Sequence, residues 1–200
     1  MNTIRTTAEK SLIEEDADLT SVLIDIHDLM IPESTEDNVL GQGGFGKVLR
    51  GKYRGHDVAI KQMRADVEDE ELHENLSRFR IECLFMKELK HENIVMLIGA
   101  VWSEAVICCV MEYVSGGSLK DVIDQKMNLT WTGEKLDYCI GICRGMVYLH
   151  KCIFFDAATE SYKEGVIHRD LKPENVLLTE AQVVKIADFG ESRIVTNDAT

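Results

Sequence analysis

The chain contains the run His168-Arg169-Asp170-Leu171-Lys172-Pro173-Glu174-Asn175, and Asp188-Phe189-Gly190 begins thirteen residues after its end. Short apolar pieces at 166–171, 176–178 and 183–186 surround both runs, and we interpret them as short strands or loops. Asp170 taken alone could be an ordinary loop aspartate. A specified run of eight residues, at about 5% chance per position, essentially never arises by coincidence in a chain of this length.

Upstream, a glycine-rich segment reads Gly41-Gln42-Gly43-Gly44-Phe45-Gly46-Lys47-Val48. Glycine lets the backbone turn and approach phosphates closely where a Cβ would clash. The pattern alone is weak, because three fixed glycines occur by chance in roughly one chain in fifteen of this length. An ordinary hairpin turn therefore stays open. The position between two expected strands argues against a dinucleotide-binding motif, which joins a strand to a helix.

Two charged residues lie in apolar surroundings between these segments. Lys61 ends the run Val58-Ala59-Ile60-Lys61, and Glu82 lies within an expected helix among apolar residues. A buried lysine is costly without an anion nearby. Lys61 could instead reach solvent at a strand end, and Glu82 could lie on a solvated helix face. A Lys–Glu pair would satisfy both charges and direct the lysine toward phosphates.

The hydrophobic pattern predicts strands first and helices later. We expect strands at 39–40, 47–53 and 56–61, a helix at 65–89 and β-rich runs at 94–101 and 105–113. Ser118 is expected to cap a short helix to residue 127, Thr132 a longer helix to residue 150, and a weak helix is expected within 9–30. The later part of the 65–89 helix places several side chains at spacings consistent with burial: Phe79, Ile81, Cys83, Phe85, Met86 and Leu89. This order indicates an α+β arrangement with two lobes.

The runs together resemble the signature set of protein kinases, in the same order and contexts. The loop from Asp170 to Asn175 resembles the serine/threonine version, and Ile98-Gly99-Ala100-Val101 with the glycine loop is most similar to the tyrosine-kinase-like group. The resemblance covers roughly residues 31–200. It implies an α+β, two-lobed protein kinase-like fold with a complete small lobe at 31–114. An incomplete large lobe at 115–200 would reach the start of the activation loop, and 1–30 would be an N-terminal extension.

The resemblance implies Mg²⁺-dependent transfer of the ATP γ-phosphate to a serine or threonine hydroxyl of a protein substrate. Lys61 would hold the α- and β-phosphates and pair with Glu82. Asp170 would accept or orient the proton of the substrate hydroxyl, and Lys172 would lie near the γ-phosphate. These four residues are the catalytic candidates.

The same resemblance places the nucleotide and the metal. Asn175 and Asp188 would bind Mg²⁺, which prefers hard oxygen ligands. Phe45 would shield the phosphates, and Met111 resembles the gatekeeper that borders the adenine site. The residues expected to bind ATP are Leu40, Gly41, Gln42, Gly43, Gly44, Phe45, Gly46, Val48, Ala59, Lys61, Met111, Glu112, Val114 and Leu177.

Two further features of the family concern the active state. The side chains that resemble the stack linking the two lobes are Met86, Leu97, His168 and Phe189. Arg169 suggests control by phosphorylation, because an arginine there can pair with an added phosphate. Ser192, Thr196 and Thr200 are the candidate acceptors in the following loop, and unchanged activity after all three are replaced with alanine would contradict this hypothesis.

Composition narrows the partners and the compartment. The 200 residues carry a net charge of −13, which argues against nonspecific binding to nucleic acid or anionic membranes. No apolar run approaches 18 residues, so no membrane span is expected. The first 20 residues lack the apolar core of a signal peptide and a glycine at position 2. The six cysteines form no C-x-x-C pair, and we expect buried, reduced thiols in a cytoplasmic protein.

The chain departs from the family in two places. The link at 151–165 is longer than usual, and we expect a surface loop or a helix extension there. The sequence stops ten residues after Gly190, before an Ala-Pro-Glu segment, so we expect residues 1–200 alone to be unstable or inactive. A non-catalytic pseudokinase or truncated scaffold that binds nucleotide or a protein partner is the alternative to an active kinase. A metabolic nucleotide-binding enzyme is a third interpretation, which 168–175 opposes.

Overall fold

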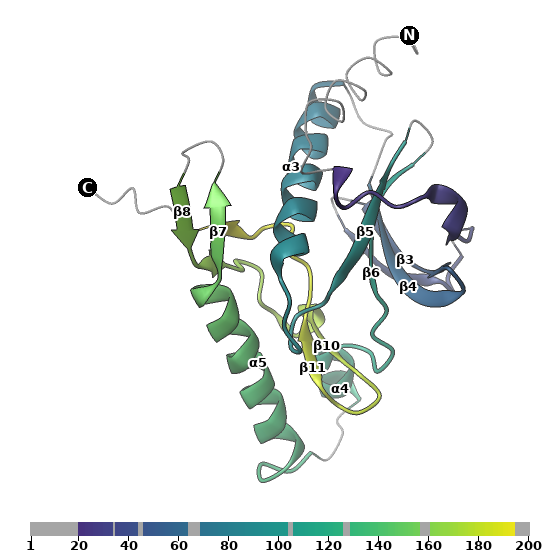
Figure 1. The fold of residues 1–200 in the computed structure, drawn as a ribbon. Helices are drawn as coiled ribbons and strands as arrows, with labels where there is room; N and C mark the ends of the chain where they lie inside the picture. Colours follow the sequence, from purple (N-terminus) through teal and green to yellow (C-terminus); the bar gives the residue numbers. More distant parts are fainter. Residues whose placement is uncertain are drawn as a thin grey trace. The chain divides into compact units, whose positions relative to one another are not determined.

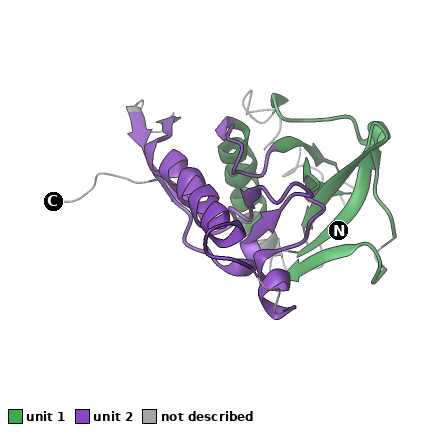
Figure 2. Ribbon diagram, turned by 90° about the horizontal axis from the view of Figure 1, so that it is seen from below, with its two compact units in different colours: residues 1–87, 97–113 green, residues 88–96, 114–200 purple. Residues whose placement is uncertain are grey.

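The computed structural model describes residues 20–33, 35–43, 46–63, 69–103, 106–125, 129–156 and 161–194. Figure 1 shows the helices and strands coloured along the sequence. The chain divides into two compact units (Figure 2). Unit 1 comprises Met1–Lys87 and Leu97–Tyr113, and unit 2 comprises Glu88–Met96 and Val114–Thr200. Each unit has a hydrophobic core of its own.

Unit 1 is built on an antiparallel six-stranded sheet with the order β1-β3-β4-β6-β5, in which β2 pairs with β3. A tight turn at Arg54 and Gly55, both with positive φ (47° and 84°), joins β3 to β4. Such turns match the twist of the strands that they connect. The strands are β1 (Leu29–Met30), β2 (Val39–Gly43), β3 (Gly46–Tyr53), β4 (His56–Met63), β5 (Leu97–Trp102) and β6 (Ile107–Glu112).

The core of unit 1 lies on both faces of this sheet. Helix α3 (Asp69–Glu88) covers one face, where Phe79 meets Trp102 edge to face at 5.8 Å between ring centroids. Ile60 is buried in the cluster on the other face. Ile81, which was expected to be buried, is 60% exposed because it points away from the sheet. Residues 64–68, the predicted first turn of this helix, lie outside the described residues.

The segment at 20–30 packs within unit 1. The Ile24 N–H donates to the Ala100 carbonyl at 2.9 Å, and the Ala100 N–H donates to the Val22 carbonyl at 2.8 Å. Val22 and Leu29 are buried, and a short 3₁₀ helix, η1 (Ile26–Asp28), lies between them. The helix expected within 9–30 does not extend past the start of this segment, and residues 1–19 lie outside the described residues. The domain boundary at residue 31 stays a prediction.

Unit 2 combines two helices with three antiparallel strand pairs, β10 with β11, β9 with β12 and β7 with β8. Its core cluster joins α4, α5, β10 and β11 through Val122, Tyr138, Leu178 and Val184. The elements are α4 (Leu119–Asp124), α5 (Glu134–Lys151), β7 (Ile153–Asp156), β8 (Ser161–Glu164), β9 (Val166–Ile167), η2 (Pro173–Asn175), β10 (Val176–Leu178), β11 (Val184–Ile186) and β12 (Arg193–Ile194).

The helix starts of unit 2 agree with one predicted cap and contradict the other. Ser118 caps α4 and forms a reciprocal capping box with Asp121, and its N–H and hydroxyl hold the pKa of the Asp121 carboxyl below its usual value. Thr132 does not cap α5, since Gly133 occupies the N-cap position without a side-chain cap. Thr130 instead donates its N–H and its hydroxyl to the Glu134 carboxylate, at 3.1 and 3.0 Å.

The 151–165 segment is a β-hairpin, so both expectations for it, a surface loop and a helix extension, were wrong. Strand β7 pairs with β8 from Ile153↔Glu164 to Asp156↔Ser161. Phe154 is buried, whereas Ile153 and Tyr162 are 64% and 75% exposed. Alternation of this kind favours a strand over a helix. Residues 157–160 lie outside the described residues.

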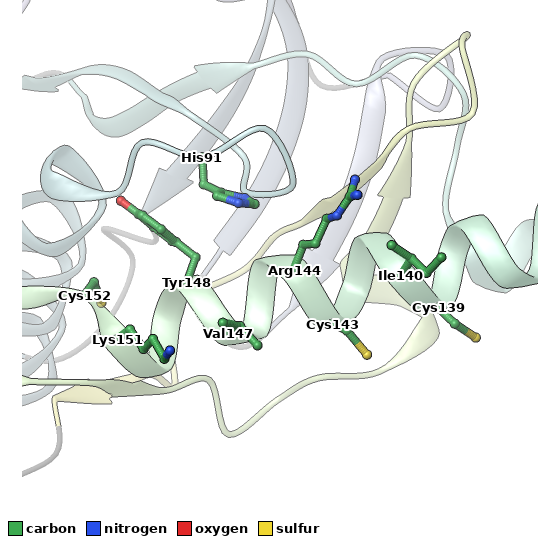
Figure 3. A pocket seen from close by; sticks show the side chains of 9 residues that line it. All are labelled: His91, Cys139, Ile140, Cys143, Arg144, Val147, Tyr148, Lys151 and Cys152. Atoms are coloured by element: carbon green, nitrogen blue, oxygen red, sulfur yellow. The ribbon is translucent and has the colours of Figure 1, made fainter.

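The cysteines differ in burial from the prediction. All six are free thiols, but Cys139 and Cys143 are exposed on α5. They line a shallow apolar pocket on this helix (Figure 3), together with His91, Ile140, Arg144, Val147, Tyr148, Lys151 and Cys152. Within the described residues, no helix combines the length and the apolar character needed to cross a membrane.

Helix α5 lies close to β11 because two of its residues that face this strand, Gly141 and Gly145, are glycines. A Cβ on Gly145 would stand 2.7 Å from Ile186 Cδ1 and 3.0 Å from the carbonyl oxygen of Asn93. We expect Gly145→Val to destabilise the fold by about 1–3 kcal/mol, since overpacking forces neighbours apart. Urea unfolding measures the change. Cys143→Ala, an exposed substitution on the same helix, should change stability by less than about 0.5 kcal/mol, and equal stability of both variants would contradict the tight packing.

Candidate active site

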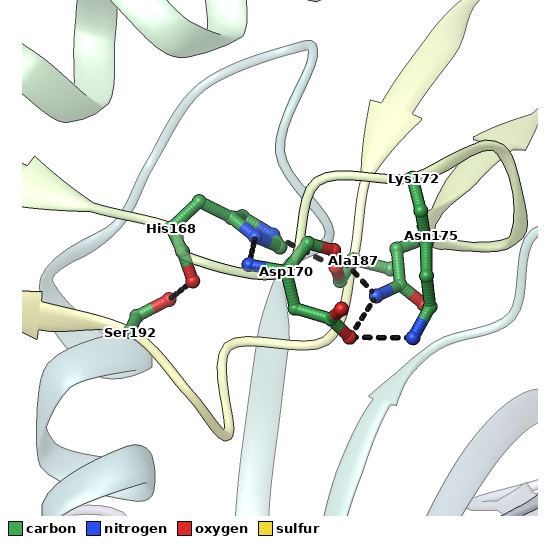
Figure 4. Close-up of polar contacts among 6 residues, drawn as sticks. All are labelled: His168, Asp170, Lys172, Asn175, Ala187 and Ser192. Atoms are coloured by element: carbon green, nitrogen blue, oxygen red, sulfur yellow. Dashed lines mark hydrogen bonds and ion pairs between the residues drawn. The ribbon is translucent and has the colours of Figure 1, made fainter.

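Three predicted site residues converge on one carboxylate in unit 2. Lys172 Nζ and Asn175 Nδ2 donate to Asp170 Oδ2, at 2.7 and 2.9 Å (Figure 4). Asn175 Nδ2 also donates to the Asp170 carbonyl at 2.9 Å. Asn175 is 8% exposed, whereas the Asp170 side chain is 32% exposed. The loop therefore presents a fixed carboxylate to solvent from a buried support.

The buried His168 side chain holds the 168–175 loop through hydrogen bonds. Its Nδ1 accepts the Asp170 N–H at 3.3 Å, so its Nε2 carries the proton and donates to the Ala187 carbonyl at 3.1 Å. Burial lowers the pKa of His168, which keeps the ring neutral in this role. The centroid of the Phe189 ring lies 5.1 Å from that of the imidazole. The Ser192 hydroxyl donates to the His168 carbonyl at 3.1 Å. His168 thus connects the 168–175 loop to the 187–192 segment.

Two non-glycine residues of the site have left-handed backbone conformations. Arg169 has φ 69° and Asp188 has φ 64°. Such conformations cost of order 1–3 kcal/mol and gather at functional sites. The Ala187 N–H donates to the Asn175 carbonyl at 2.9 Å, so Asp188 directly follows a residue that is tied to the other predicted metal ligand.

Asp170 and Lys172 stabilise each other's charged forms. The hydrogen bond from Lys172 holds the pKa of the Asp170 carboxyl below its usual value, and Asn175 adds to the effect. Asp170 in turn raises the pKa of Lys172, and the charge of Asp188 acts in the same direction. Asp170 is therefore an ionised carboxylate at neutral pH, which is the state that can accept a proton.

The predicted Lys–Glu pair is present in unit 1. Lys61 Nζ lies 2.7 Å from Glu82 Oε1, and the two side chains are 15% and 10% exposed. Lys61 therefore does not end in open solvent, and Glu82 does not lie on a solvated helix face. The pair joins β4 to α3, and each charge compensates the burial of the other.

The residues expected around the adenine ring divide between the two units. The register pairs Val48 with Lys61 and Ala59 with Met111, which places these four residues on one face of the unit 1 sheet. Leu40, Gly41, Gln42 and Gly43 lie on β2, and Glu112 ends β6. Gly44 and Phe45 lie outside the described residues. Val114 and Leu177 belong to unit 2, where Leu177 pairs with Lys185 across β10 and β11.

The four residues predicted to form the inter-lobe stack are likewise divided between the units, two in each. Met86 is buried and Leu97 is partly buried against the core of unit 1. His168 and Phe189 lie against each other in unit 2. The role of these four residues in joining the lobes stays a prediction.

Sequence reasoning missed the supports of the 88–96 segment in unit 2. Asn93 is 3% exposed and its Nδ2 donates to the Val184 carbonyl at 2.8 Å. The Tyr148 hydroxyl accepts a hydrogen bond from the Lys90 N–H at 2.7 Å. The Tyr148 ring stacks on the His91 ring, with 4.8 Å between the ring centroids. An asparagine beside the apolar residues Ile94 and Val95 was the available signal, because a buried amide needs hydrogen-bond partners.

Comparison with known proteins identifies the family. The model of the protein kinase domain matches residues 34–200. This chain belongs to the protein kinase family. The α+β kinase fold predicted from the sequence is thereby confirmed, and the tyrosine-kinase-like assignment stays a prediction.

The kinase is similar to several proteins named as serine/threonine-protein kinases. It is 36% identical over 187 residues to a serine/threonine-protein kinase/receptor of Acanthamoeba polyphaga mimivirus, covering 94% of this chain and 11% of that protein. It is 38% identical over 152 residues to the Dictyostelium discoideum serine/threonine-protein kinase drkD, covering 76% and 11%. A serine/threonine-protein kinase of Arabidopsis thaliana is 32% identical over 155 residues, covering 78% and 24%. The chain thus spans about a tenth to a quarter of these relatives.

Proposed function

We propose that this kinase transfers the γ-phosphate of ATP to a serine or threonine hydroxyl of a protein substrate, with Mg²⁺. The observation that carries the proposal is the Asp170 carboxylate, ionised and held by Lys172 and Asn175. The names of the relatives given above describe them as serine/threonine-protein kinases, which supports the choice of acceptor. Loss of phosphotransfer in Asp170→Asn tests the proposal, as argued in the Discussion.

In the proposed reaction, the substrate hydroxyl oxygen attacks the γ-phosphorus and the bond from that phosphorus to the β,γ-bridging oxygen breaks. ADP leaves with the electron pair of that bond, and the hydroxyl proton passes to Asp170. Lys172 Nζ already touches Asp170 Oδ2 and would place its positive charge beside the transferred phosphoryl group. Asn175 Nδ2 holds Asp170 in place through two hydrogen bonds, one to its carboxylate and one to its backbone carbonyl.

The residues proposed for Mg²⁺ fit a hard cation. Asn175 uses Nδ2 as its donor, which leaves Oδ1 as an acceptor oxygen, and Asp188 supplies a carboxylate. When bound, Mg²⁺ would offset negative charge on the phosphates. Among the described residues, no group of three or more His, Cys, Asp or Glu could hold a metal ion by itself. A site with two protein ligands suits Mg²⁺, which completes its shell with water and substrate phosphates.

Most residues of the proposed nucleotide site belong to unit 1. Glu82 holds the Lys61 ammonium at 2.7 Å, which would direct it to the α- and β-phosphates. Val48 and Ala59 are half-buried and Met111 is largely buried on the same sheet face, which provides an apolar surface for an adenine ring. The glycine loop and the backbone of Glu112 and Val114 complete the proposed ATP site.

Removing the Lys172 charge should change the pH dependence of the reaction. Lys172 lowers the pKa of Asp170, so Lys172→Met should raise that pKa toward its ordinary value. A larger fraction of Asp170 is then protonated at a given acidic pH, and the acid limb of the kcat/KM profile should move to higher pH. The profile measured for the full-length kinase checks this.

Lys120→Met is the matched control, because Lys120 pairs with Asp124 on the surface of α4. Its acid limb should coincide with that of the parent kinase. An unchanged limb in Lys172→Met would show that Asp170 does not set the acid limb, or that Lys172 does not tune it.

Three finer proposals have separate supports. The exposed apolar residues of α5, Leu136, Ile140 and Val147, support the inactivity of residues 1–200 alone, since such surfaces favour association. The free thiols support a cytoplasmic location. Phosphorylation of Ser192 would require its hydroxyl to leave the His168 carbonyl. Thr196 and Thr200 lie outside the described residues.

A further inference from the structure

Two buried cysteines meet in the core of unit 1. The sulfur atoms of Cys83 on α3 and Cys109 on β6 lie 2.8 Å apart, and both residues are 0% exposed. The two positions are 26 residues apart in the sequence, so the fold brings them together. The S–S bond of a disulfide is about 2.0 Å long, so the two sulfurs need only a small approach to bond.

The cysteine pair lies beside the charged pair of the proposed nucleotide site. Cys109 is the register partner of Lys61, and Cys83 follows Glu82 directly on α3. Both cysteines belong to the cluster on the face covered by α3. Cys108 is equally buried but points to the opposite face, into the other core cluster of unit 1. Neighbouring cysteines of β6 therefore have different environments.

We propose that Cys83 and Cys109 are a disulfide-forming pair, an oxidative modification site that joins α3 to β6. The inference goes beyond the proposed function and does not depend on it. A peroxide is the oxidant. One thiolate sulfur attacks the peroxide, the O–O bond breaks, and a sulfenic acid and water form. The second thiolate then attacks the sulfenic sulfur, the S–S bond forms, and the oxygen leaves as water. Two thiols thus lose two electrons and two protons, and one hydrogen peroxide becomes two waters.

Oxidation of this pair should be slow. Burial raises the pKa of the Cys109 thiol well above its ordinary value, and contact with Cys83 adds to the effect. Only the thiolate attacks peroxide, so a buried thiol reacts less readily than an exposed one. We therefore expect Cys139 and Cys143, which are exposed on α5, to be oxidised before the pair. Once formed, the cross-link would hold the helix that carries Glu82 against the sheet that carries Lys61.

The test is to map disulfides in the folded, full-length kinase after exposure to hydrogen peroxide. Remaining thiols are blocked with N-ethylmaleimide in denaturant, and the unreduced protein is digested with trypsin. Cleavage after Lys and Arg releases 81–87, which contains Cys83, and 91–120, which contains Cys108 and Cys109. We expect mass spectrometry to find 81–87 linked to 91–120, with the link lost on reduction.

Substitutions assign the link to one sulfur. Cys108→Ser should keep it, whereas Cys83→Ser and Cys109→Ser should each abolish it. Recovery of both peptides as blocked thiols, when exposure to peroxide is continued long after Cys139 and Cys143 are fully oxidised, would overturn the proposal. A link that persists in Cys109→Ser but vanishes in Cys108→Ser would overturn it as well.

A second measurement covers the case in which a serine variant fails to fold. Oxidised parent protein and oxidised Cys108→Ala should both melt at a higher temperature than their reduced forms, because the cross-link constrains the unfolded chain. Cys83→Ala, an apolar replacement at the same site, should show no such rise. Equal melting temperatures before and after oxidation of the parent protein would contradict the cross-link.

Discussion

Asp170→Asn is expected to lower kcat for phosphotransfer by about 10²–10⁴-fold, which is the usual contribution of a general base. Asparagine keeps the size of the side chain and an oxygen for Lys172 and Asn175, but it cannot take the substrate proton. The loop should therefore keep its geometry, and ATP affinity should change little. Steady-state kinetics of the full-length kinase with a protein substrate, together with nucleotide titration, separates the two effects.

The control for this variant is Asp137→Asn, an exposed aspartate in the first turn of α5. Its activity should match that of the parent kinase. Full activity in Asp170→Asn would remove Asp170 from the reaction. Absence of phosphotransfer in the parent protein, with nucleotide binding retained, would favour the alternative of a non-catalytic binding module.

Lys61→Met should reduce both stability and activity. The substitution leaves the Glu82 carboxylate largely buried without its partner, and breaking a buried pair in this way costs about 3–5 kcal/mol. Phosphotransfer should fall by about 10²–10³-fold, as expected when a group that stabilises developing charge is removed. Urea unfolding and kinetic assays of the full-length kinase measure the two losses.

A double variant separates these two roles of Lys61. Replacing both partners, Lys61→Met with Glu82→Leu, should recover much of the stability, because apolar residues often replace a buried ion pair without loss. Activity should stay low, since the cation is still absent. Recovery of activity in the double variant would show that Lys61 acts only through stability.

The matched control lies on the neighbouring strand. Lys52 on β3 pairs with Asp57 at 3.0 Å, but its side chain is 51% exposed. Lys52→Met should therefore cost less than about 1 kcal/mol and leave activity unchanged. A loss of stability as large as that of Lys61→Met would indicate a general intolerance of the sheet to loss of charge.

The residues of the candidate site could be identified from the sequence because its motifs are short and depend only on nearby residues. The 168–175 run contains Asp170, Lys172 and Asn175 within six residues. In the structure, Lys172 and Asn175 both donate to the Asp170 carboxylate. The capping role of Ser118 was equally local, since a cap needs only residues in the first turn. The Lys61–Glu82 pair was anticipated, but only as one of several alternatives.

Local patterns gave the wrong prediction in three places. The 151–165 segment allowed a loop or a helix, and pairing between β7 and β8 produced a hairpin. Thr132 and Thr130 both precede α5, and only Thr130 contacts the Glu134 carboxylate. Ile81 fitted a buried spacing, yet it points away from the sheet. For Ile81 the outcome depends on which side of the helix faces the core, and a shift of one residue reverses that. For the other two segments it depends on which residues pair or contact one another in the folded chain.

The amino-acid sequence sufficed for the kinase fold, the identity of the catalytic candidates and the nucleotide motif, because each depends on residue types at fixed short spacings. Contacts between distant segments required the tertiary structure. The register of β4 with β6 and the packing of α3 bring Lys61 to Glu82 and Cys83 to Cys109, across 21 and 26 residues. Local sequence preferences do not determine these contacts between distant residues. The contacts form only when whole faces of a helix and a sheet are buried together, and the strand register decides which side chains share a face.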